Sequence, residues 1–180
     1  MRSGWVEQVI RYWFEELPSE AWFRKDERVD AMIRERFGAL HDEAAQISPQ
    51  QLSSPLECLA AVIVLDQFSR NMFRGSARAF AADALALAIS QHAIAAGLDR
   101  QLTSQQRWFL YMPFQHCEDR AVQARSLELF TQLGDPQNID YARRHKEVVD
   151  RFGRFPHRNE ALGRESTAEE REFIATHRGF

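Results

Sequence analysis

The sequence predicts an all-α fold built from antiparallel helix hairpins with short connections. Three observations support this prediction. Apolar residues recur at intervals of three and four in most segments, as on the buried face of a helix. Capping residues precede several of these segments, and Gly or Pro follows them. No segment shows the strict alternation or the tight hairpin turns that are typical of β-strands.

The N-terminal quarter of the chain contains two predicted helices. Ser3–Phe14 carries aromatic and aliphatic residues at helical intervals, and Pro18 ends the pattern. Ser19 then predicts a short turn that carries Trp22 and Phe23. From Asp26 to Ala44 a regular apolar stripe alternates with charged residues, which predicts an amphipathic helix with one buried face.

Two further helices are predicted in the middle of the chain. Ser54 followed by Pro55 and Glu57 has the pattern of a capping box with Pro at the first helical position. This predicts a helix over Pro55–Phe68 that is buried on most sides. The Ala- and Leu-rich stretch Ala77–Ala96 predicts the next helix, and Gly97 lies where a C-terminal cap belongs.

The remaining helices are predicted from caps and breakers. Thr103 and Gln106 form another capping box, opening a helix that we expect Pro113 to close. Glu118 and Asp119 place negative charge at the start of the next predicted helix, which runs to Leu133. The helix dipole favours negative charge at this N-terminal end. A helix is predicted over about Asn138 to Phe152. The last predicted helix is short and begins at a Thr167–Glu170 capping box.

Length, composition and charge restrict the function classes. The 180 residues fit one domain over 1–180, and 44% hydrophobic with 27% charged residues excludes a disordered or fibrous chain. A net charge of −3 argues against nucleic acid as a partner. The longest apolar run, Leu59–Leu65, is too short to cross a membrane, and the N-terminus lacks a signal peptide. We therefore expect a cytoplasmic protein with no membrane partner, and its oligomeric state stays open.

The first segment of functional interest is Leu65–Gly75, with the sequence LDQFSRNMFRG. Asp66 directly follows the apolar run, so we expect a partly buried carboxylate, and Arg70 lies one helical turn later on the same face. Arg74 is expected on the last carbonyl groups of this helix. The pair can tie down the end of the helix, or it can bind a ligand directly.

The second segment, Tyr111–Asp119, places His116 in a predicted loop two residues before Glu118. A histidine with a nearby acid can act as a general base, or it can cap a helix through a backbone carbonyl. Cys117 has no neighbouring base or cysteine partner, so we interpret it as a small buried core residue rather than a nucleophile.

The third segment is His145–Arg164. From Arg143 to Arg164 there are seven Arg or Lys and three acids, a local charge of +4 in a chain of net −3. Two interpretations are open: a C-terminal strap pinned by Arg–carboxylate pairs, one of them to Asp66 or Glu118, or a pocket lined by guanidinium groups for a carboxylate or phosphate. Because the acids available to offset this charge lie in the other two segments, we expect all three segments to converge in space.

These three segments resemble the bacterial family catalogued as domain of unknown function 924. The similarity extends from about Trp13 to Phe173, and the third segment is its most specific part. The resemblance implies a tetratricopeptide-like fold, a helical bundle or superhelix of hairpins, and implies no activity, substrate or catalytic residue. Cys117 stands where the resemblance leads us to expect Ser.

We hypothesise a binding module whose groove takes an anionic small molecule or peptide. The alternative is a small enzyme in which His116 or His157 is the general acid or base and Asp66 or Glu118 orients it; a purely structural role for the polar clusters is a third possibility. No phosphate loop, zinc or dinucleotide motif is present, so no cofactor or metal is expected. The ligand-binding candidates are Asp66, Arg70, Asn71, Arg74, His116, His145, Arg151, Arg154, His157, Arg158 and Asn159.

Overall fold

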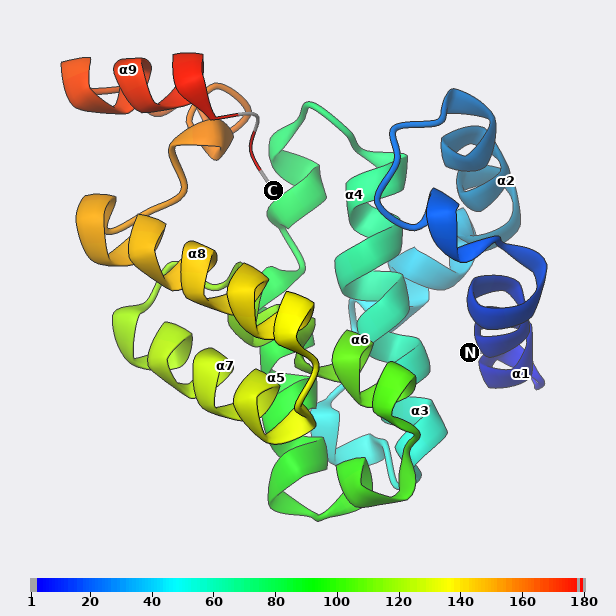
Figure 1. Cartoon of the computed structure of the whole chain (residues 1–180). Helices are drawn as coiled ribbons and strands as arrows, with labels where there is room; N and C mark the ends of the chain where they lie inside the picture. Colours follow the sequence, from blue (N-terminus) through cyan, green and yellow to red (C-terminus); the bar gives the residue numbers. More distant parts are fainter. Residues whose placement is uncertain (1–2, 178, 180) are drawn as a thin grey trace. The chain divides into compact units, whose positions relative to one another are not determined.

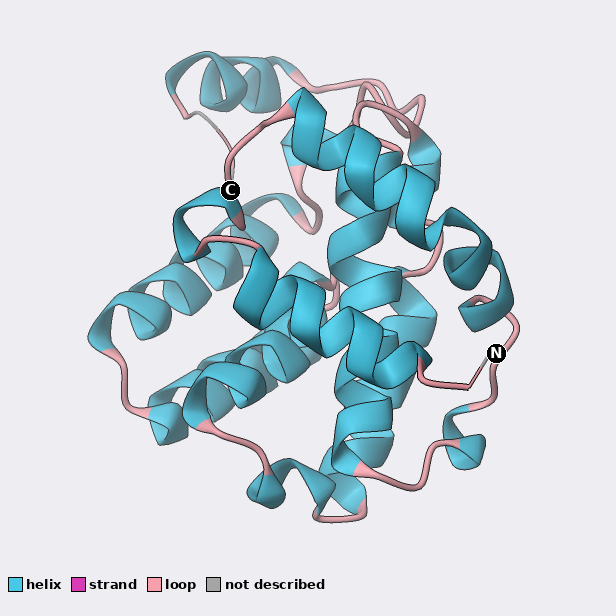
Figure 2. Cartoon of the chain, turned by 90° about the vertical axis from the view of Figure 1, so that its right-hand side faces the viewer, coloured by secondary structure: helices cyan, strands magenta, loops and turns pink. Residues whose placement is uncertain are grey.

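The computed structural model describes residues 3–177 and 179, which form helices and connecting loops (Figures 1 and 2). No β-strand occurs in this part of the chain, so the all-α prediction is confirmed. The chain divides into two units: unit 1 comprises Met1–Arg74 and Arg78–Pro113, and unit 2 comprises Gly75–Ala77 and Phe114–Phe180. Within the described residues, no helix combines the length and the apolar character needed to cross a bilayer.

Unit 1 is organised around the apolar segment that follows Ser54. The capping box predicted there is present, with Ser54 Oγ accepting from Glu57 N and the Glu57 carboxylate accepting from Ser54 N. All residues from Cys58 to Ser69 are buried. The α-helices of unit 1 are α1 (Trp5–Arg11), α2 (Glu27–Ala44), α3 (Pro55–Val62), α4 (Ser69–Met72), α5 (Asp83–Ala95) and α6 (Ser104–His116), whose last three residues belong to unit 2.

The predicted helix Pro55–Phe68 is continuous with α4, but part of it has π-helical rather than α-helical hydrogen bonding. Residues Ile63–Phe68 form a π-helical segment between α3 and α4, and Tyr12–Glu16 form a second π-helical segment after α1. In unit 1, α3 packs against α1 and α5, while α2 packs against α4 and the π-helical segment Ile63–Phe68. Such insertions of one residue into a helix are frequent at functional sites.

Two helix predictions in this region need correction. The helix expected over Ala77–Ala96 begins with a separate 3₁₀ turn at Ala77–Phe80, and its regular part is α5. Pro113 does not close its helix, because α6 continues through it to His116. Proline removes one backbone donor from a helix interior without excluding the helical conformation. The carbonyl that loses its helical donor at Pro113 is that of Phe109, and the Ser90 hydroxyl of α5 donates to the next carbonyl, of Leu110, at 2.6 Å.

Unit 2 contains a helix hairpin and a short C-terminal helix. The hairpin consists of α7 (Arg120–Leu133) and α8 (Pro136–Phe152), which pack side by side (Figure 1). Gly134 adopts φ 89° between them, a conformation that favours glycine. After a 3₁₀ turn at Pro156–Arg158, α9 (Ala168–Thr176) begins at the predicted Thr167–Glu170 capping box. The apolar core that joins α8 to α9 consists of Val148, Val149, Phe152, Phe155 and Phe173.

Candidate functional site

The first predicted segment supplies a buried ion pair in unit 1. Asp66 is fully buried in the π-helical segment, and Arg70 Nη1 lies 3.0 Å from its Oδ1. The same guanidinium donates to both oxygens of Asp83 at 3.0 and 3.1 Å. Burial by itself would lower the pKa of Arg70, but the two carboxylates raise it above its ordinary value. The predicted pair of Asp66 and Arg70 is confirmed.

The π-helical register explains why Ser and Arg follow Asp66. When i→i+5 hydrogen bonding returns to i→i+4, carbonyl groups at the junction need additional donors. Ser69 Oγ donates to the Leu65 carbonyl at 2.6 Å, and Arg70 Nη1 donates to the Asp66 carbonyl at 2.8 Å. These two side chains therefore stabilise the junction from within the same helix.

Asn71 and Arg74 form a second cluster in unit 1, around Asp30 of α2. Arg74 donates to both oxygens of Asp30 at 2.8 and 2.9 Å, and Asn71 Nδ2 donates at 2.7 Å. Burial would raise the pKa of Asp30, but these donors hold it below its ordinary value. The expectation that Arg74 binds the last carbonyls of its helix is wrong, because Arg34 Nη2 donates to the Met72 carbonyl instead, at 2.7 Å.

A serine–histidine contact in unit 1 was missed by sequence reasoning. His41 Nε2 lies 2.8 Å from Ser69 Oγ, and His41 Nδ1 lies 3.6 Å from an oxygen of Asp42. The order of groups is that of a hydrolytic triad. Ser69 is fully buried, however, and its hydroxyl binds the Leu65 carbonyl. The contact therefore joins α2 to α4 rather than presenting a nucleophile, and residues 28 positions apart give no local sequence signal.

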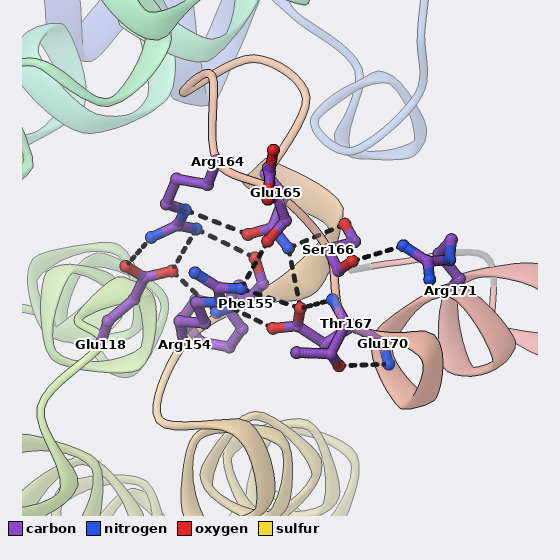
Figure 3. A network of polar contacts seen from close by, with 10 residues as sticks. Glu118, Arg154, Phe155, Arg164, Glu165, Ser166, Thr167, Glu170 and Arg171 are labelled. Atoms are coloured by element: carbon purple, nitrogen blue, oxygen red, sulfur yellow. Dashed lines mark hydrogen bonds and ion pairs between the residues drawn. The ribbon is translucent and has the colours of Figure 1, made fainter.

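In unit 2 the second and third segments meet at Glu118. Figure 3 shows Arg164 and Phe155 on its carboxylate. Arg164 donates to its two oxygens at 2.7 and 2.9 Å, and the Phe155 N–H donates at 2.7 Å. Burial would raise the pKa of Glu118, but Arg164 and the Phe155 N–H hold it below its ordinary value. Glu118 thus fastens the C-terminal segment to the end of α6.

A second clamp in the same network joins Arg154 to Glu170 of α9 (Figure 3). Arg154 donates to both oxygens of Glu170 at 2.6 and 2.8 Å, and Asn159 Nδ2 lies 3.3 Å from one of them. The Arg154 hydrogen bonds lower the pKa of Glu170 to about 2, against the effect of burial. Asn159 also accepts from Arg164 Nε at 3.0 Å, so it links the two clamps.

Two other candidates of this segment have exposed partners. Arg151 lies 2.7 Å from Glu169, and both side chains are more than half exposed. His157 Nε2 lies 2.7 Å from the main-chain oxygen of His177. Neither contact forms part of a buried cluster.

The remaining candidates gather around Phe155 in unit 2. His116 is the last residue of α6 rather than a loop residue, because α6 passes Pro113. Its ring centroid is 6.2 Å from that of His145, a buried residue of α8. Arg158 Nη2 donates to the His116 carbonyl at 2.8 Å, and its guanidinium lies 4.8 Å from the Phe155 ring centroid. The His145 ring packs edge-on against Phe155 at 5.6 Å.

Two groups compete for one nitrogen of the His145 ring. Its Nδ1 lies 2.8 Å from the Tyr141 carbonyl oxygen and 3.1 Å from Gln115 Nε2. The carbonyl oxygen calls for a protonated Nδ1 and the amide nitrogen for an unprotonated one, so these contacts hold the ring in place without assigning its tautomer.

Neither the cysteines nor the surface hollow of unit 2 adds a residue to the group formed by His116, His145 and Arg158. Cys58 is buried, which raises the pKa of its thiol to about 11, whereas Cys117 is partly exposed and not the buried core residue expected. Across residues 3–177 and 179, no three metal-ligating acid, His or Cys side chains come together. A shallow surface hollow of about 370 Å³ is lined by Ala124, Leu127, Glu128, Thr131, Gln132 and Lys146, none of which is a candidate.

The carboxylates that pair with the predicted cations come largely from outside the three segments. Asp30, Asp83 and Glu170 were not among the acids expected in this role. Asp119 lies at the start of α7, as expected, and caps it by accepting from two backbone N–H groups. The sequence contained one sign of the position of Glu170, because the Thr167–Glu170 capping box places this carboxylate at the start of a helix. The second and third segments meet within unit 2. The first belongs to unit 1, and its convergence with them stays a prediction.

Comparisons with known proteins agree with this architecture. The family model described as "Bacterial protein of unknown function (DUF924)" matches residues 9–178. No protein among those with curated descriptions matches this chain. A solved structure described as a protein of unknown function, ATU0120, from Agrobacterium tumefaciens is 38% identical, covers 96% of this chain and 97% of its own, and gives a TM-score of 0.89. The chain belongs to the bacterial family of unknown function DUF924.

Proposed function

We propose that this chain is a helical binding module for a small anionic molecule, held in unit 2 by His116, His145 and Arg158. The observation that carries the proposal is the grouping of the His116 and His145 rings with the Arg158 guanidinium, in which His145 and Arg158 both contact the Phe155 ring. Imidazole and guanidinium N–H groups are donors suited to carboxylate and phosphate oxygens. The ring of Phe155 supplies an apolar wall between them.

The other arginines of the segment support this site rather than forming it. Arg154 and Arg164 each make two hydrogen bonds to one carboxylate, of Glu170 and Glu118 respectively. A guanidinium engaged in this way is matched in charge and fixed in position. The two clamps flank Phe155 and hold the chain that carries Arg158, which pre-organises the site and lowers the cost of ordering it on binding.

The helix hairpin α7–α8 supports a tetratricopeptide-like arrangement as part of the same proposal. Its helices are joined by only two residues and pack along each other. In such hairpins, side chains from facing helices and from the segment that follows can line a binding surface. His145 comes from α8 and Arg158 from the segment that follows it.

The test is thermal unfolding with inorganic phosphate and with malonate, at low ionic strength. Because a ligand of the native state stabilises it, the melting temperature is expected to rise with anion concentration. Arg158→Gln should remove the rise, and added sodium chloride should weaken it. The matched control is Arg143→Gln, an exposed arginine of α8 paired with Asp140, which should keep the rise. No rise in the unsubstituted protein, or an equal rise in Arg158→Gln, would overturn the proposal.

The rival function is a small enzyme that uses His116 or His157 as general acid or base. The contacts in unit 2 give it less support. Glu118, the expected orienting acid, accepts from Arg164 and Phe155, and His157 Nε2 contacts a main-chain oxygen.

A further inference from the structure

Two polar atoms of α7 are fully buried and have no hydrogen-bond partner in the part of the chain that the structure describes. They are Gln123 Oε1 and Ser126 Oγ. Buried polar atoms of folded proteins almost always bind a protein group or an ordered water, because an unpaired one is costly. Residues three apart on a helix have Cβ atoms about 5–6 Å apart, so one small molecule can contact both side chains.

The other end of the Gln123 amide fixes its orientation. Nε2 donates to the carbonyls of Gln115 and Cys117, each at 2.7 Å, and lies 3.5 Å from the Phe114 carbonyl. The amide nitrogen carries two hydrogens, and the two short bonds use both of them. A flipped amide would place Oε1 against these carbonyl oxygens, which cannot donate. Oε1 is therefore an acceptor that still needs a donor.

Ser126 departs from the pattern of other helical hydroxyl groups in this chain. Several of them donate to the carbonyl four residues earlier, namely those of Ser69, Ser90, Thr131 and Thr176. Among the described residues, Ser126 Oγ makes no such bond. Because this local bond is available to a serine inside a helix, its absence indicates that the Ser126 hydroxyl faces a different partner.

The chemistry of the two atoms favours a small neutral ligand. Gln123 Oε1 only accepts hydrogen bonds, which disfavours an anion. A metal ion such as Ca²⁺ or Mg²⁺ takes about six oxygen ligands, many more than two uncharged side chains supply. A water molecule can donate to Oε1 and can either donate to Ser126 Oγ or accept from it. Buried waters make such bonds to otherwise unsatisfied polar groups.

From these observations we infer that α7 holds one buried water molecule, bound by Gln123 Oε1 and Ser126 Oγ, as a fixed part of unit 2. The water holds the amide whose nitrogen binds the last carbonyls of α6, which need donors from outside the helix. Arg158 donates to the His116 carbonyl, which lies between the two that Gln123 binds. The end of α6 is thus fastened by two side chains. The inference does not depend on the proposed anion site.

The direct test is a crystal structure of the full chain at a resolution that shows ordered water. One water is expected within about 3.2 Å of both Gln123 Oε1 and Ser126 Oγ. In the crystal structure of Ser126→Val, which replaces the hydroxyl by methyl groups, this water should be missing. A direct hydrogen bond between the two side chains, or no density between them, would overturn the inference. The structure of the unsubstituted protein decides the matter if the variant does not fold.

Denaturant unfolding supplies an independent measurement. If one water joins the two side chains, Ser126→Ala and Gln123→Ala should not act independently. The double substitution should change the unfolding equilibrium constant at least about threefold less than the product of the two single effects. The matched control is Ser90→Ala, because Ser90 is a buried helical serine of unit 1 that has its own partner, the Leu110 carbonyl. Its effect should multiply with that of Gln123→Ala. Multiplicative effects for Ser126 and Gln123 would contradict a shared water.

Discussion

At the scale of single residues, the buried pair of Asp66 and Arg70 predicts a large loss of stability when Asp66 is replaced. Asp66→Ala removes one of the two carboxylates that bind the Arg70 guanidinium. Breaking a buried ion pair costs about 3–5 kcal/mol, and because Asp83 stays in place we expect the free energy of unfolding to fall by about 3 kcal/mol. Denaturant unfolding measures this loss. Asp140→Ala, which breaks exposed pairs in α8, is the matched control and should cost less than about 1 kcal/mol. Equal effects would contradict the prediction.

Arg154 tests whether the C-terminal arginines hold the fold or bind a ligand. Arg154→Ala leaves Glu170, whose side chain is 3% exposed, without its guanidinium. We expect the free energy of unfolding to fall clearly more than it does in Arg151→Ala, since the carboxylate of Glu170 loses the guanidinium that binds both of its oxygens. The stabilisation by phosphate should persist, because Arg154 supports the proposed site without forming it. Arg151→Ala, with its exposed partner Glu169, should lose little stability. Loss of the phosphate effect together with an unchanged stability would assign Arg154 to the site instead.

At the scale of elements, the start of α9 makes a specific prediction. Thr167 Oγ1 accepts from Glu170 N, and the Glu170 carboxylate accepts from Thr167 N. Thr167→Ala removes the hydroxyl half of this capping box and should lower the free energy of unfolding by about 1 kcal/mol. Thr176→Ala is the control. Its hydroxyl contacts carbonyls in the last turn of the same helix and caps nothing, so its effect should stay within about 0.5 kcal/mol. A loss from Thr167→Ala no larger than that from Thr176→Ala would contradict the prediction.

At the scale of the whole molecule, the free energy of unfolding should decrease as the pH is lowered, in two separate pH ranges. Burial lowers the pKa of His41 below 6.5, so the fold favours the neutral ring. The unfolded chain then binds more protons, and stability decreases as pH falls below about 6.5 until the folded pKa is reached. The folded carboxyl groups of Asp30, Glu118 and Glu170 also have lowered pKa values. Their contribution is complete above about pH 4.5 and is lost in more acidic solution, toward about 2 for Glu170.

Denaturant melts over a pH series would separate these windows. His41→Gln should remove the dependence that begins near pH 6.5, whatever its effect on stability at neutral pH. Glu170→Gln should reduce the dependence below about pH 4.5 and leave the upper window unchanged. Stability that rises as the pH is lowered from neutrality to about 5 would contradict the signs of these shifts.

The sequence by itself determined the features that depend on near neighbours. The caps at Ser54 and Thr167 and the pair of Asp66 with Arg70 involve residues within one turn of each other, so local geometry decides them. The all-α class follows from the same local patterns repeated along the chain. Pro113 shows the limit of this reasoning, because a proline removes one backbone donor without ending the helix that contains it.

Only the tertiary structure decided which carboxylate matches which arginine. Asp30 and Arg74 are 44 positions apart, and Glu118 and Arg164 are 46 apart. Composition shows that acids and arginines are present, but not which of them a packed fold brings within 3 Å. Exposure is decided in the same way. Phe23 and the buried Phe109 are the same residue type, and the packing of rings from distant segments leaves one of them at the surface.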